Sequence, residues 1–249
     1  MNRHFFIVGA QRSGTTYLYT VLDEHPEIEM ARPLVPEPKF FLRTDLQTSR
    51  PREYEEQFFG RKPGAKRYGE KSTSYIEYEA AARRIACWYP DTQLIFLLRN
   101  PVTRAISNYQ LSKRNGLETL PIAQAFSEEA LRRDAYNHRR LSVSPFAYLQ
   151  RGHYIKYLLA YEKIFDRRQM IVLIYEECVG QLANVQALYE TLGVEKSFVP
   201  PSLSKRVNSG KTDDGTAPPE LRLHLTDYFS ESVAALEAYI GRTVIGWRH

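Results

Sequence analysis

The sequence predicts an α/β fold with three layers, in which helices flank a central parallel sheet. Three observations predict it. Short apolar runs alternate along the chain with longer stretches of helical periodicity. Apart from Gln93, the runs at 93–98 and 170–174 are continuously apolar, as in strands that are buried on both faces of a parallel sheet. The run at 5–8 leads through a glycine-bounded turn into a helical pattern. Since no linker or internal repeat interrupts the 249 residues, we expect a single domain over 1–249.

The first strand, turn and helix have the composition of a phosphate cradle. Gly9 and Gly14 bound a polar turn, and turn amides together with a helix N-terminus concentrate positive charge at one point. The glycine spacing is that of a P-loop, which predicts a P-loop-like domain, but Thr15 stands where a P-loop has lysine. Arg12, inside the turn, is a bidentate partner for anionic oxygens. The turn therefore indicates a phosphate or sulfate site that works without a metal; a plain glycine turn remains the alternative.

The remaining elements follow from periodicity and from capping residues. Helices are expected over 14–24, 76–88, 101–115, 121–133, 153–165, 179–192 and 219–240, with a further short strand near 68–72. Asn100 and Pro101 suit the N-cap and the first position of one of these helices. Residues 31–67 show no clear periodicity and contain five prolines, so we expect an irregular functional segment such as a substrate loop or lid.

Composition limits the class of ligand and the compartment. A net charge of +5 favours an anionic ligand without indicating nucleic acid. Cys87 and Cys178 are the only two cysteines and lack metal-ligand spacing, so a reducing cytosol is expected. No apolar run approaches the roughly 18 residues that span a membrane, and none reads as a signal peptide. We expect a cytoplasmic protein with no metal, nucleic acid or membrane partner.

A second anion site is indicated at the end of the strand at 93–98. Arg99 follows that strand directly, and Ser107 lies about two turns into the next helix. Both side chains can reach one phosphate group. The alternative for Arg99 is an ordinary ion pair at a strand end.

Several motifs occur in register along nearly the whole chain. They are Gly9–Thr16, His25-Pro26, Glu37–Phe41, Glu70–Tyr75, Leu98–Pro101 with Ser107 and Tyr109, Arg151–Tyr154, and Ile240–Thr243 with Trp247 and His249. In these motifs the chain resembles the sulfotransferases that use 3′-phosphoadenosine 5′-phosphosulfate (PAPS). The branch that it resembles most contains the heparan sulfate O- and N-sulfotransferases and their bacterial relatives. The resemblance implies one sulfotransferase domain over residues 1–249.

The resemblance also implies roles for individual residues. Glu37 matches the general base of the family, and Lys71 matches a lysine near the transferred sulfuryl group; with Arg12 they are the expected catalytic residues. The residues expected to bind the 5′-phosphosulfate are Gln11, Arg12, Ser13, Gly14, Thr15 and Thr16. Arg99 and Ser107 are expected to bind the 3′-phosphate, and Ser209, Gly210 and Lys211 are expected to close over the nucleotide.

The expected reaction is in-line transfer of a sulfuryl group from PAPS to a hydroxyl of a carbohydrate or small-metabolite acceptor, with PAP as product. Such a transfer needs positioning, fixed positive charge and one base. A P-loop kinase and an inactive nucleotide-binding module are the alternatives. The basic run with Arg132, Arg133, His138, Arg139 and Arg140 is either a surface for an anionic acceptor or a solvated helix face.

Overall fold

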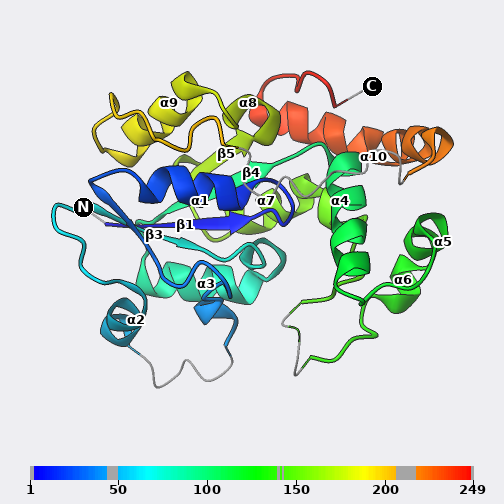
Figure 1. Cartoon of the computed structure of the whole chain (residues 1–249), viewed down its shortest axis with the longest axis horizontal. Helices are drawn as coiled ribbons and strands as arrows, with labels where there is room; N and C mark the ends of the chain where they lie inside the picture. Colours follow the sequence, from blue (N-terminus) through cyan, green and yellow to red (C-terminus); the bar gives the residue numbers. More distant parts are fainter. Residues whose placement is uncertain (1–2, 44–49, 139–140, 142, 206–216, 248–249) are drawn as a thin grey trace. The chain divides into compact units, whose positions relative to one another are not determined.

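The computed structural model describes residues 3–43, 50–138, 141, 143–205 and 217–247 (Figure 1). The chain forms two compact units, each built from two segments. The first unit takes Met1–Leu98 and Ala160–Asn208, and the second takes Arg99–Leu159 and Ser209–His249. The expectation of one sulfotransferase domain over 1–249 stays a prediction. None of the helices in the described ranges combines the length and the apolar character that a membrane span requires.

The first unit contains a five-stranded sheet in which every pairing is parallel. Its strands are β1 (His4–Gly9), β2 (Ile28–Met30), β3 (Arg67–Lys71), β4 (Gln93–Leu98) and β5 (Met170–Ile174). The order across the sheet is β2-β3-β1-β4-β5, so the first strand lies in the middle. The carboxyl ends of all strands therefore lie along one edge, where ligands bind in open α/β sheets.

Helices cover both faces of this sheet, which confirms the three-layer prediction (Figure 1). On one face, α1 (Thr15–Asp23) and α9 (Leu182–Leu192) share an apolar core with Phe5 and Ile7 of β1. On the other face, Phe6 packs edge-on against Phe41, and α3 (Glu79–Trp88) contributes the fully buried Ile85. Alternate residues of β1 thus point into two cores, as a doubly covered strand requires.

The other helices complete the two units. The first unit also holds α2 (Pro51–Phe58), α8 (Tyr175–Cys178) and the 3₁₀ turns Phe40–Leu42, Tyr75–Glu77 and Arg167–Gln169. The second unit holds α4 (Pro101–Arg114), α5 (Ile122–Ser127), α6 (Glu129–Arg132), the 3₁₀ turn Gln150–Gly152 and α10 (Pro219–Ile240); α7 (Tyr154–Glu162) begins in it and ends in the first. The predicted capping of α4 is confirmed, because Asn100 Oδ1 accepts hydrogen bonds from the amides of Val102 and Thr103 at 3.0 and 3.1 Å.

The interpretation of residues 31–67 as irregular was wrong over α2. Pro51, counted there as a helix breaker, occupies the first position of α2, where proline lacks only an amide that would be unpaired anyway. The helix is polar and buries only Tyr54 and Phe58, which lie four residues apart on one face. Two buried residues give too little periodicity to reveal a helix in sequence.

Four predicted helices are shorter or divided. The helix expected over 76–88 begins only at Glu79, after the 3₁₀ turn Tyr75–Glu77, and the helix expected over 153–165 ends at Glu162. The helix expected over 121–133 is split into α5 and α6 at Glu128, where ψ is 2°. The split lets the Glu129 carboxylate accept the amides of Leu149 and Gln150 at 2.5 and 2.9 Å. The helix expected from residue 179 begins only at Leu182, because Gly180 adopts a left-handed φ of 76° that separates α8 from α9.

His4 predicts an acid-sensitive stability. Burial, followed by repulsion from Arg3 and Arg67, lowers the pKa of His4 to about 4. The unfolded chain therefore binds a proton between pH 6.5 and about 4 that the folded chain does not, and the free energy of unfolding falls as pH falls through this window. At about 1.4 kcal/mol per pKa unit the loss is at most about 3 kcal/mol. Glu55 Oε1, 3.6 Å from Nε2, attracts the protonated ring and makes this an upper limit.

Urea unfolding of the wild type and of His4→Phe between pH 4 and 7 measures this effect. Phenylalanine keeps an aromatic ring beside Tyr68 and Tyr89, whose ring centroids lie 5.5 and 4.3 Å from that of His4. The variant should lose less stability on acidification than the wild type. An equal loss in both proteins would show that other groups carry the acid sensitivity.

Candidate functional site

The glycine-bounded turn joins β1 to α1 at the carboxyl edge of the sheet. Gly14 is the N-cap of α1 with φ 85°, and a Cβ atom there would lie 2.5 Å from the ring of Tyr175. Any larger residue would meet both a strained backbone and an aromatic ring, so glycine is required. Arg12 also adopts a left-handed φ, of 67°, and its side chain is half-buried in the turn. The structure thus brings Gln11 to Thr16 together in one compact turn, which we call the cradle.

The cradle has the donors that an anion requires. The first amides of a helix have no partner within the helix, and no side chain caps α1. Ser13 is fully buried, and its Oγ atom has no hydrogen-bond partner among the described residues. A buried hydroxyl without a partner is costly, so its presence here fits a site that receives acceptor oxygens. These features fit the phosphosulfate group of a nucleotide donor.

Neighbouring strand ends hold the cradle in place. The amide of Ala10 donates to the Leu97 carbonyl of β4 at 2.8 Å. On the other side, Gln11 Nε2 donates to Ser74 Oγ and Glu77 Oε1, both at 3.3 Å. The Gln11 side chain therefore links the cradle to the segment after β3 by hydrogen bonds.

Glu37 and Lys71 form an ion pair beside the cradle. Lys71 Nζ lies 2.7 Å from Glu37 Oε1, and the two side chains are 5% and 15% exposed. Thr73 holds the same carboxylate, since its amide donates to Oε2 at 3.1 Å and its Oγ1 to Oε1 at 2.9 Å. The carboxylate is thus fixed by three groups of one short segment while part of it stays accessible. A fixed, partly exposed carboxylate can accept a proton from a bound hydroxyl.

Strand register explains why this pair lies near the cradle. Lys71 is the last residue of β3 and pairs with Ile7 of β1, two residues before Gly9. The amide of Ser72 continues the ladder by donating to the Ile7 carbonyl at 3.1 Å. The segment carrying Lys71 and Thr73 therefore leaves the sheet beside the start of the cradle.

The two phenylalanines of the Glu37–Phe41 motif anchor the Glu37 segment in the hydrophobic core. Phe40 and Phe41 are 2% and 0% exposed and pack against Tyr54 and Trp88. Arg84 Nη1 donates to the Phe41 carbonyl at 2.8 Å. The motif thus combines a buried aromatic anchor with a carboxylate three residues earlier.

The second unit contains the pair that was expected to bind the 3′-phosphate. Arg99 directly follows β4, and its carbonyl accepts a hydrogen bond from the hydroxyl of Tyr154 at 2.7 Å. Asn100 caps α4 and also donates to the carbonyl of Gly246 at 3.3 Å. Ser107 is buried in α4. Ser209, Gly210 and Lys211 lie outside the described residues.

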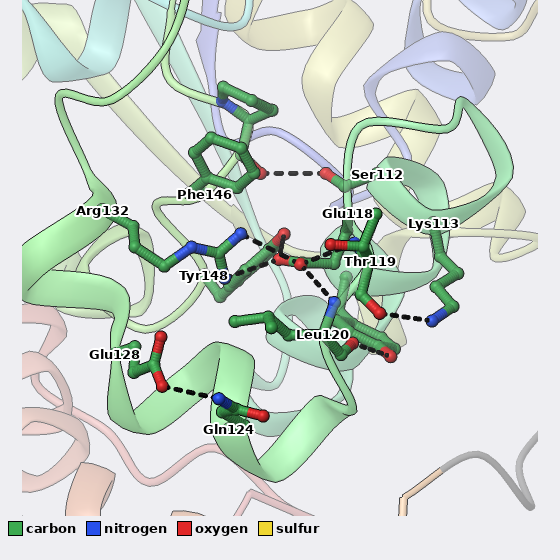
Figure 2. A network of polar contacts seen from close by, with 12 residues as sticks. Ser112, Lys113, Glu118, Thr119, Leu120, Gln124, Glu128, Arg132, Phe146 and Tyr148 are labelled. Carbon is green, nitrogen blue, oxygen red and sulfur yellow. Dashed lines mark hydrogen bonds and ion pairs between the residues drawn. The ribbon is translucent and has the colours of Figure 1, made fainter.

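The segment between α4 and α7 is organised by the buried carboxylate of Glu118 (Figure 2). Nη1 and Nη2 of Arg132 donate to it at 3.1 and 3.0 Å, and the Tyr148 hydroxyl donates at 2.7 Å. Burial acts to raise the pKa of Glu118, but the hydrogen bonds outweigh it and lower that pKa. Arg132 also stacks over the Phe146 ring at 4.5 Å. Arg132 thus has a structural role and does not belong to an exposed basic surface.

The parallel sheet and the glycine-bounded cradle at its carboxyl edge place the protein among P-loop-like α/β proteins. The family model described as the sulfotransferase domain matches residues 2–208, and the chain belongs to this family, as its motifs predicted. It is 30% identical over 231 residues to mouse (Mus musculus) heparan sulfate glucosamine 3-O-sulfotransferase 3A1, covering 82% of this chain and 52% of that one. The chain spans about half the length, or less, of the curated relatives it matches.

Solved structures share the fold. The sulfotransferase from Alicyclobacillus acidocaldarius has a TM-score of 0.81 and 29% identity, with 98% of each chain covered. Mouse sulfotransferase SULT7A1 complexed with PAP has a TM-score of 0.57 and 18% identity, covering 94% of this chain and 85% of that one; this similarity shows the fold alone.

Sequence reasoning did not assign roles to Thr73 and Glu70. Thr73 supplies two of the hydrogen bonds that hold Glu37, and Glu70 is a fully buried carboxyl group behind the pair. Both belong to the Glu70–Tyr75 motif, in which β3 ends at Lys71 and Thr73 lies in the turn that follows. Membership of this motif was the available signal.

Proposed function

We propose that this protein transfers a sulfuryl group from PAPS to a hydroxyl group of an acceptor, with Glu37 as general base. The observation that carries the proposal is the fixed Glu37–Lys71–Thr73 cluster at the edge where the cradle begins. An anion cradle alone supports binding. A carboxylate held beside it supplies the proton acceptor that a transfer to a hydroxyl requires.

Each residue of the cluster has a distinct task. Glu37 accepts the proton of the acceptor hydroxyl. Thr73 orients the carboxylate, so that its accessible lone pairs face the acceptor. Lys71 and Arg12 supply fixed positive charge near the transferred group, where negative charge is spread over the equatorial oxygens in the transition state. Lys71 also balances the charge of Glu37 in the state described here.

Residues of the cradle and of α4 would hold the donor. Bound PAPS would supply an activated sulfuryl group, with PAP as the leaving product. Gln11 to Thr16 would bind the 5′-phosphosulfate through amides, the Ser13 hydroxyl and Arg12. Arg99 and Ser107 would bind the 3′-phosphate, a proposal supported by the family motifs and by the position of Arg99 directly after β4.

The acceptor is a carbohydrate or a small metabolite that carries a hydroxyl group. Carbohydrate is supported by the curated relatives, whose names specify heparan sulfate glucosamine. A cytoplasmic location stays a prediction.

A transfer assay tests this function. Protein incubated with sulfur-labelled PAPS, excess chelator and a panel of glucosamine-containing oligosaccharides and phenolic or aliphatic alcohols should label at least one acceptor. The same panel with γ-labelled ATP and magnesium should remain unlabelled. Phosphate transfer from ATP without any sulfuryl transfer from PAPS would show that the protein is a kinase.

A further inference from the structure

Behind the Glu37–Lys71 pair lies a second carboxyl group that takes no part in the proposed chemistry. Glu70 is 1% exposed, and among the described residues its hydrogen bonds come from hydroxyls and none comes from a cation. Ser72 Oγ donates to its Oε1 at 2.5 Å and the Tyr54 hydroxyl to its Oε2 at 2.6 Å, while the Tyr75 hydroxyl also bonds to it. Burial raises the pKa of Glu70, and the three hydroxyls act against that rise. Burying a carboxyl group without a cation costs free energy of folding, which suggests that Glu70 has a specific role.

Two of these hydroxyls also bind the segment that carries Glu37. The amide of Lys39 donates to Ser72 Oγ at 2.8 Å, and the amide of Phe41 donates to the Tyr75 hydroxyl at 3.0 Å. Each hydroxyl has one hydrogen to donate and lone pairs to accept. Because Ser72 and Tyr75 direct their hydrogens toward Glu70, their lone pairs face the two amides.

The Glu37 segment is thus fixed at three points of one short stretch. Glu37 itself is held by Lys71 and Thr73, and the amides at positions 39 and 41 are held by the two hydroxyls that Glu70 orients. Ser72 bonds to Glu70, whereas Lys71 and Thr73 bond to the Glu37 carboxylate. Lys71 and Thr73 therefore hold the carboxylate of Glu37, and Ser72 and Tyr75 hold the backbone that carries it.

We propose that Glu70 is a positioning residue, which fixes the backbone of residues 37–41 through the Ser72 and Tyr75 hydroxyls and so holds Glu37 in place for proton transfer. This inference rests on the proposed function of Glu37. It is separate from nucleotide binding, because none of the hydrogen bonds involved reaches the cradle. Glu70 itself touches neither the donor nor the acceptor in this account.

Glu70→Gln is the sharpest perturbation because it is isosteric and removes one acceptor. The amide nitrogen of glutamine carries only donors, so at least one of the three hydroxyls must turn its lone pairs toward residue 70. If Ser72 or Tyr75 turns, its hydrogen faces the amide of residue 39 or 41 and that hydrogen bond is lost. Small displacements of a catalytic group reduce the rate by as much as about 10²-fold.

Tyr54→Phe provides the matched control. Tyr54 donates to the same carboxyl group but binds no amide of the Glu37 segment in the hydrogen bonds that are described. The Tyr54→Phe substitution removes one hydrogen bond from Glu70 and leaves the contacts of Glu70 with Ser72 and Tyr75 in place. A purely structural role of Glu70 would make the two variants alike.

The experiment combines steady-state kinetics with a double-mutant cycle. Glu70→Gln should reduce kcat by about 10-fold to 10²-fold, with the KM for PAPS and the Kd for PAP unchanged, whereas Tyr54→Phe should keep the wild-type kcat. In the Glu37→Gln background, Glu70→Gln should cause little further loss, because the group that it positions is already gone. A full additional loss in that background, or a kcat equal to that of the wild type in both Glu70→Gln and Ser72→Ala, would overturn the proposal.

Amide hydrogen exchange of the peptide covering residues 37–42 makes the outcome independent of the proposed function. Exchange should be faster in Glu70→Gln and Ser72→Ala than in the wild type and in Tyr54→Phe. If the wild type transfers no sulfuryl group, the proposed function fails, and the inference that Glu70 positions a catalytic base fails with it. If transfer occurs but exchange in Glu70→Gln equals that of Tyr54→Phe, only the positioning role is refuted.

Discussion

Glu37→Gln should reduce sulfuryl transfer by about 10²-fold to 10⁴-fold, the usual contribution of a general base. Glutamine keeps the shape of the side chain and an oxygen that can still accept from Lys71 and Thr73, so the local packing survives. Its amide cannot take the proton of an acceptor hydroxyl at neutral pH. The Kd for PAP should remain unchanged because the cradle makes no described contact with Glu37. Turnover and calorimetry on the same preparation measure both quantities.

Glu27→Gln is the control for this change. Glu27 also forms an ion pair with a lysine, Lys66, but these two residues directly precede β2 and β3, at the opposite end of the strands from the cluster, and Lys66 is 63% exposed. Exposed pairs contribute at most about 1 kcal/mol, and this variant should transfer at the wild-type rate. Unchanged turnover in Glu37→Gln would remove Glu37 from the mechanism.

Lys71→Met should reduce turnover by about 10²-fold to 10³-fold, as the loss of one preorganised donor to transition-state charge does elsewhere. Two effects add. The positive charge near the transferred group is lost, and the Glu37 carboxylate, whose side chain is 15% exposed, loses its cation. Methionine fills similar space in this buried position. Single-turnover kinetics at saturating PAPS isolates the chemical step from binding.

Lys66→Met serves as the matched lysine substitution, since it also breaks an ion pair but outside the cluster. It should leave single-turnover rates at the wild-type value. If Lys71→Met raised KM for the donor and left the chemical step unchanged, Lys71 would contribute to binding only.

The central elements of the fold could be predicted from sequence because their signals are local. The strands predicted at 93–98 and 170–174 match β4 and β5 at both ends. Each contains an apolar run with polar residues on either side, and such a run marks where the strand lies. The last helix matches α10, which begins at Pro219 and ends before Gly241. Strand β2 was missed because three residues are too few to show a period, and they form a strand only by pairing with β3.

The candidate site was predicted in part. The motifs identified Glu37 and Lys71 one by one, but their ion pair depends on how the segment 37–41 packs against the residues that end and follow β3, which no local pattern specifies. The same holds for Thr73 and Glu70, whose roles follow from a segment distant in sequence. The role expected for Arg12 stays a prediction, although its left-handed backbone in the cradle confirms that the turn has the tight geometry implied by its glycines.

Calorimetric titration of the protein in chelator with PAP, AMP and ATP tests the central claim most directly. PAP should bind tightly without metal. AMP, which lacks the 3′-phosphate expected at Arg99 and Ser107, should bind at least about 10-fold more weakly, since a hydrogen bond to a charged group contributes about 1.5–3 kcal/mol. ATP should also bind much more weakly than PAP, with or without magnesium. Tighter binding of magnesium-ATP than of PAP would contradict the assignment of the cradle to PAPS-dependent transfer.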